Sequence, residues 1–200
     1  MRPLILRETS SEFELPAEGH YLGNVDAIVL LGRQDTNYGE RRQVHIRVRL
    51  AGTSRSYKDK AGQRHTVPMT IGRTYTLSLH RSSALLVVVE ALLGRGLNED
   101  ERRGGGFDLW GIAGLPGSFD VRHSQGNNGR TYANIDIISP APAGTPLLPI
   151  GECLLYDPDQ SSGEELAKLS KWMQEAIRKR LPEPESTDGT AVPFDDDVPF

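Results

Sequence analysis

The feature that most constrains the fold is a stretch in which apolar and polar residues alternate without a break. Across residues 43–50, every second residue is aliphatic and the residues between them are polar or basic. Successive side chains of a strand point to opposite faces, so this pattern predicts a half-buried strand with a basic outer face. Segments 20–31 and 73–80, which precede and follow it, are also typical of strands, so we expect three successive strands.

The next part of the pattern adds a helix and two more strands. A helix capped by Ser82 or Ser83 and ended by Gly94 is predicted, because a serine hydroxyl accepts hydrogen bonds from the first free backbone amides. Strands are predicted over 118–124 and 130–139, joined by a loop of glycine and asparagine that suits a hairpin. Five strands with one helix between the third and fourth is the order of the OB-fold. We therefore expect a mainly β, OB-like barrel.

The chain divides into four parts by composition. Residues 1–139 form the OB-like domain, and 140–161 form a proline-rich linker that is not expected to sustain regular structure. Residues 162–181 are predicted to form one amphipathic helix, which packs either on the barrel or on a second copy in a homo-oligomer. One face of this helix carries Leu166, Leu169, Trp172, Met173 and Ile177. Residues 182–200 are acidic, almost without apolar side chains until residue 192, and are expected to be a disordered tail.

Charge is segregated along the chain, although the formal net charge is only -4. Between residues 33 and 73 there are ten Lys or Arg and three Asp or Glu, whereas 182–200 holds six acids and no Lys or Arg. The basic stretch is suited to a polyanion, and the acidic tail would repel one.

Three features favour a cytoplasmic protein that does not enter a membrane. The longest apolar run, Ala84–Val89, is too short to cross a bilayer. The first eight residues lack the apolar stretch of a secretory signal. The single cysteine, Cys153, has no second thiol for a disulfide, which is typical of a reducing compartment.

A nucleic-acid site needs cations that contact phosphates and aromatic rings that stack on bases. The second strand supplies basic residues, and the connection 51–69 is expected to form an electropositive finger. With the last hairpin, the candidate DNA contacts are Arg41, Arg42, His45, Arg47, Arg49, Arg55, Tyr57, Lys58, Lys60, Arg64, Arg73, Arg130 and Tyr132. The second-strand arginines are the strongest phosphate candidates, and Tyr57 and Tyr132 are the strongest stacking candidates. Tyr75 is expected in the core, by its place in the alternation.

The last residues carry a short motif, in which three aspartates precede an aliphatic residue, a proline and a phenylalanine. This end resembles that of the bacterial single-stranded-DNA-binding protein family. The resemblance implies a tip that docks on replication, recombination and repair proteins. In that arrangement Phe200 is the anchor, Val198 and Pro199 form a stiff apolar neck, and the acids guide the encounter; these acids are Asp195, Asp196 and Asp197.

The body is similar, more loosely, to small phage and prophage proteins that bind single-stranded DNA or act in replication. The likeness lies in segments 73–80 and 129–135. Together with the tail, it implies a protein that binds and protects single-stranded DNA during replication, recombination or repair.

An enzyme and an adaptor are two other classes of function for a chain of this composition. An enzyme is disfavoured because the five histidines are dispersed and Gly104–Gly106 is followed by Phe107 rather than by the lysine of a phosphate loop. We therefore expect no catalytic residue, cofactor or metal. An adaptor whose OB-like body binds protein rather than DNA stays open, as does RNA in place of DNA.

Overall fold

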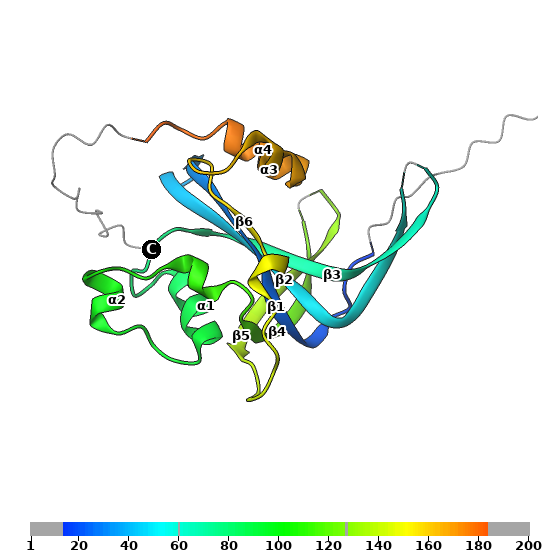
Figure 1. Ribbon diagram of the computed structural model, residues 1–200, viewed down its shortest axis with the longest axis horizontal. Coiled ribbons are helices and arrows are strands. Elements are labelled where there is room, and N and C mark those ends of the chain that lie inside the picture. Colours follow the sequence, from blue (N-terminus) through cyan, green and yellow to red (C-terminus); the bar gives the residue numbers. More distant parts are fainter. Residues whose placement is uncertain (1–13, 60, 127, 184–200) are drawn as a thin grey trace, which may run out of the picture.

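The computed structural model describes residues 14–59, 61–126 and 128–183, and the described chain is mainly β (Figure 1). The strands are β1 (Gly19–Thr36), β2 (Gly39–Lys58), β3 (Arg64–Thr76), β4 (Pro116–Gln125), β5 (Thr131–Pro140) and β6 (Leu154–Tyr156). They form a six-stranded sheet in the order β3-β2-β1-β4-β5, with antiparallel neighbours, and β6 pairs with β1 in parallel. No hydrogen-bonded ladder joins β3 to β5 in the described chain, so the sheet is open, although the two strands approach within 8 Å between Cα atoms.

One face of the sheet, here called the inner face, packs on the helix α1 (Ala84–Leu93). Ser83 begins this helix by accepting a hydrogen bond from the amide of Leu85, and Gly94 ends it with a φ of 67°. Leu85 and Val89 point into a core that is lined by the aliphatic row of β2. The aliphatic residues of segment 43–50 therefore face the core, as the alternation predicts for a strand.

The connection from β3 to β4 contains more than the one predicted helix. A five-residue helix, α2 (Glu99–Arg103), and a 3-10 turn, η1 (Leu109–Ile112), follow α1. Asn98 and Glu101 form a capping box at the start of α2, which explains a helix without a single buried residue.

The opposite face, here called the outer face, is covered by the C-terminal part of the chain (Figure 1). The predicted helix over 162–181 is in fact two helices, α3 (Gly163–Lys168) and α4 (Lys171–Arg178). They are separated because Leu169 turns to extended backbone and enters the core, while the Gln174 side chain donates to the carbonyl oxygen of Leu169 at 2.8 Å. Met173 and Ile177 complete this contact with the sheet, so the helical segment packs on its own sheet.

Segment 140–161 is not a linker along its whole length, because it contains η2 (Ile150–Glu152) and β6. The reason lies in β1. On one edge, β4 pairs only with Gly19–Asn24, and β6 pairs with Ala27–Val29 further along. Three residues of β6 thus hydrogen-bond to a stretch of β1 that β4 does not reach.

The predicted finger over 51–69 is a β-hairpin rather than a loop. After an irregularity between Arg49 and Ser54, β2 and β3 stay paired as far as Lys58 and Arg64. Asp59 closes the turn, because its carboxylate accepts hydrogen bonds from the amides of Ala61 and Gln63, both at 2.9 Å. In the described part of the chain, no helix is long and apolar enough to cross a membrane.

Candidate nucleic-acid interface

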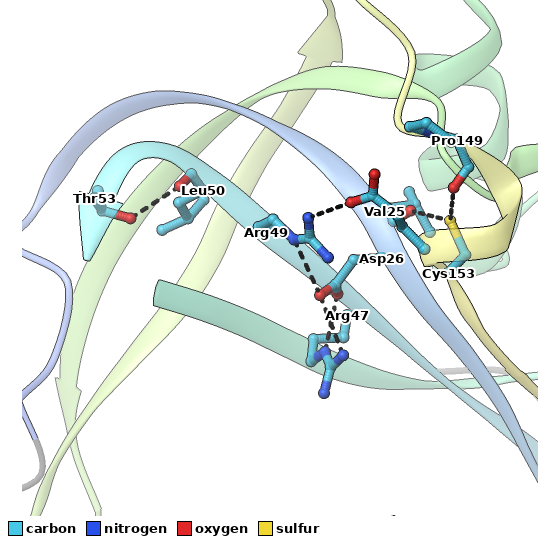
Figure 2. A network of polar contacts seen from close by, with 9 residues as sticks. Val25, Asp26, Arg47, Arg49, Leu50, Thr53, Pro149 and Cys153 are labelled. Carbon is cyan, nitrogen blue, oxygen red and sulfur yellow. Dashed lines mark hydrogen bonds and ion pairs between the residues drawn. The ribbon is translucent and has the colours of Figure 1, made fainter. Parts of the chain in front are cut away.

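The second-strand arginines lie on the outer face, where they meet a buried acid (Figure 2). Arg47 donates from Nε and Nη2 to the two carboxylate oxygens of Asp26, at 2.9 and 3.1 Å. The Nε of Arg49 lies 3.7 Å from the same carboxylate, and its Nη1 lies 3.1 Å from Glu152. Asp26 has almost no exposure, so both cations are compensating an internal charge. Both arginines lie on the outer face, as the alternation predicts, but each guanidinium has an acid partner and is about one-third exposed. Their contact with phosphates stays a prediction.

His45 is buried, with 8% of its surface exposed, although the sequence predicts it on an exposed basic face. Its ring packs edge-on against Trp172 of α4, with 5.0 Å between centroids, and its Nδ1 lies 3.1 Å from the Thr74 hydroxyl. Gly72 leaves room for the ring, since a Cβ there would lie 2.4 Å from Nε2. Burial, and secondly the charge of Arg47, lower the pKa of His45 to about 4, so it is neutral near pH 7. It is a packing residue that holds α4 on the sheet.

The finger presents the predicted cations to solvent. Lys58 and Arg64 face each other across the ladder and both are exposed. Tyr57, 50% exposed, stacks on His65 with 5.4 Å between ring centroids and 25° between planes. Arg55 lies on the same strand and is half-buried, and Lys60 lies outside the described residues. The finger thus combines cations with a stacked aromatic pair.

The β4–β5 hairpin projects from the same end of the sheet as the finger (Figure 1). The register shows this. β4 pairs with Gly19, the first residue of β1, through Val121 and continues past it to Gln125. β2 pairs with Gly23 through Leu50 and likewise continues past the start of β1. Tyr132 is 44% exposed on this hairpin, and its hydroxyl accepts a hydrogen bond from Asn128 at 2.8 Å. Arg130 is exposed beside it. The two hairpins bring three exposed cations of the predicted set, Lys58, Arg64 and Arg130, and both predicted stacking residues to one end of the molecule.

The faces of the two hairpins differ. Tyr57 pairs with His65, which continues the inner-face row of β3 through Met69. Tyr132 alternates with Ala133, which packs against the inner-face core, so Tyr132 points outward. A single DNA strand stacked on both rings would therefore have to pass from the inner face at one hairpin to the outer face at the other.

Three predicted contacts lie elsewhere. Arg41 and Arg42 pair with the far end of β1, away from the finger, and Arg42 lies 3.3 Å from Glu183. Arg73 is exposed on β3, with its guanidinium carbon 5.6 Å from the ring centre of Tyr75. Tyr75 itself is buried, as predicted.

Sequence reasoning missed two residues that shape this region. Asp26 is the one acidic residue in an otherwise apolar stretch of β1, and nothing in the local pattern predicts that it forms ion pairs with two arginines. The sequence predicts Trp172 on the packed face of a helix, but it is 47% exposed beside His45. The sequence gives no signal for this, because Trp172 and Ala176 lie beside Met173 and Ile177 on one side of a helix.

Other chemistry has little support in the described residues, among which no three His, Cys, Asp or Glu side chains form a metal-binding group. Cys153 is half-buried, and burial raises the pKa of its thiol, which disfavours a reactive thiolate. The predicted docking tip, 195–200, lies outside the described residues. No protein-family model matches the sequence, and no curated protein matches it at a significant level.

Proposed function

We propose that this chain binds single-stranded DNA through an OB-like body and recruits DNA-processing proteins through residues 195–200. The observation that carries the proposal is the β2–β3 finger. It holds exposed cations and an exposed tyrosine at the end of the sheet from which the β4–β5 hairpin also projects. Such a protein would act in the cytoplasm, during replication, recombination or repair.

The strand order supports an OB-like body. In the order β3-β2-β1-β4-β5, closure of the barrel requires only that β3 meet β5, and these strands approach within 8 Å between Cα atoms. The helix α1 follows β3, as in that fold. In such barrels the face of strands two and three and the loop between strands four and five commonly bind oligonucleotides, and the finger extends the first of these and the β4–β5 hairpin is the second.

The chemistry of the finger favours a single strand over a duplex. Cations contact phosphates in either form, whereas an exposed aromatic ring stacks only on bases that are free of their own partners. Tyr57 is held against His65, so little conformational freedom is lost when a base stacks on it.

The test measures the affinity of an end-labelled oligo-dT by fluorescence anisotropy at several salt concentrations. Lys58→Ala/Arg64→Ala should weaken binding and reduce the slope of log K against log[salt] by about 1.4, from roughly 0.7 per lost single-strand contact. The matched control, Arg178→Ala/Lys179→Ala, removes two exposed cations from the end of α4 and should change neither value. Equal effects of the two pairs would contradict the proposed finger site.

Recruitment is tested separately. Phe200→Ala keeps every tail carboxylate, so it should leave the oligo-dT affinity unchanged. It should abolish binding to a partner protein with an apolar pocket rimmed by basic residues. Full partner binding by this variant would contradict the anchor role.

A further inference from the structure

An apolar hollow of about 270 Å³ opens between the β3–α1 connection and the segment that leads to η1. Its lining includes Leu77, Leu79, Phe107, Leu109 and Trp110. These five side chains are each half-buried, so the hollow has an apolar floor that solvent reaches. None of them is used by the proposed nucleic-acid site.

A second hollow, of about 480 Å³, adjoins the first through the shared residues Leu77, Ser78 and Leu79. Its remaining lining is His80, Arg81, Arg102 and Arg103. Among the described residues, neither Arg81 nor Arg102 takes part in an ion pair, and Arg103 lies 3.6 Å from the highly exposed Glu99. The two hollows together make an apolar pocket with a basic rim.

Residues 192–200 have the complementary chemistry. Their sequence is Val-Pro-Phe-Asp-Asp-Asp-Val-Pro-Phe, in which one apolar triplet stands on each side of three acids. A phenylalanine ring suits a half-buried apolar hollow, and adjacent aspartates suit an arginine rim. The prolines limit the conformations that the segment loses when it is bound.

The described chain ends close to this pocket. Glu183, the last described residue, lines a third hollow that also contains Leu30 and Leu77, both of which line the apolar hollow as well. From Glu183 to Phe194 there are eleven residues, which span up to about 36–40 Å when extended. The segment can therefore reach the neighbouring hollow without strain.

We propose that this basic-rimmed apolar pocket is the docking surface for residues 192–200 of the same chain. A phenylalanine of one Val-Pro-Phe triplet occupies the apolar hollow beside Trp110, and the aspartates lie along Arg81 and Arg102. Docking would withhold the triplets from other proteins until it is released. The inference does not depend on nucleic-acid binding by the finger.

The test uses the full chain carrying Trp172→Phe, which leaves Trp110 as the only tryptophan. Acrylamide quenching of Trp110 is compared with and without Phe194→Ala/Phe200→Ala. With the segment docked, removal of both rings should raise the quenching constant and shift the emission to the red. These substitutions lie outside the described fold, and unchanged far-UV circular dichroism would verify that the body is intact.

A second set of variants tests the ion pairs between the rim arginines and the aspartates of the segment. Arg81→Ala/Arg102→Ala, or Asp195→Asn/Asp196→Asn/Asp197→Asn, should also raise the quenching constant, whereas Arg178→Ala/Lys179→Ala should not. An unchanged constant in the phenylalanine variant would overturn the proposal. So would protection of Trp110 that disappears on dilution, because the occupant would then belong to a second copy of the chain.

Discussion

Arg47 donates two hydrogen bonds to Asp26, a carboxylate of which only 3% of the surface is exposed. The pairing adds a structural contact to the β2 outer face, because the cation that the sequence favours for phosphate contact is the partner of a buried acid. The exposed cations of the finger carry the proposed electrostatic contact with the strand.

Arg47→Ala should lower the free energy of unfolding by about 3 kcal/mol, because it leaves the buried Asp26 charge without its main partner. We take the lower end of the range for broken buried pairs, since the Arg47 side chain is 33% exposed. Urea unfolding measures the change. Adding Asp26→Asn to Arg47→Ala should recover part of the loss, and Lys58→Ala should have little effect. No loss in Arg47→Ala would show that the pair is not structural.

Stability should depend on pH through His45. Its pKa is about 4 in the fold, against the ordinary histidine value of 6.5, so the unfolded chain binds a proton more readily. The free energy of unfolding that neutral, buried His45 supports is fully present above about pH 6.5. It falls by roughly 3 kcal/mol in total as the pH falls from there toward 4, because the unfolded chain takes up the proton first. Urea unfolding from pH 7 to pH 4 should show a shallower pH dependence in His45→Gln than in the parent or in the exposed His80→Gln. An unchanged pH profile in His45→Gln would contradict this assignment.

Tyr57→Ala should weaken oligo-dT binding by about 1–3 kcal/mol, which is roughly 5-fold to 150-fold, because a base loses its stacking platform. Tyr57→Phe should bind as the parent does, since the ring face is retained. The matched control is Tyr38→Ala, which removes an exposed tyrosine at the β1–β2 turn, at the other end of β1. Anisotropy titrations of the three variants measure the effect, and parent-like binding by Tyr57→Ala would exclude the ring from the site.

Local patterns predicted the parts of the fold that local chemistry determines. The alternation around Val44 and Ile46, the Ser83 cap and the Gly94 stop are each set by residues close together in the chain. Five strands are present in the described part of the first 140 residues, but their bounds differ from the prediction. The strand expected over 73–80 is in fact Arg64–Thr76, so residues 77–80 lie outside it. The mainly β class follows from these elements.

The parts that sequence reasoning missed depend on contacts between distant residues. β6 forms because β1 has an edge that β4 does not cover. Beside β6, the thiol of Cys153 contacts the carbonyl oxygen of Val25, which lies 128 residues away in the chain. The break at Leu169 depends on the apolar face that the sheet presents. His45 is buried because α4 places Trp172 against it, which no alternation within β2 could reveal.

The most direct measurement of the central claim compares the parent protein on one labelled sequence, first as a single strand and then as a duplex, over a range of salt. If Lys58, Arg64 and Arg130 each contact a phosphate, the plot of log K against log[salt] for the single strand should slope near -2.1, from about -0.7 per contact. The account predicts this slope and much weaker binding to the duplex. A flat salt response, or equal affinity for the two forms, would contradict it.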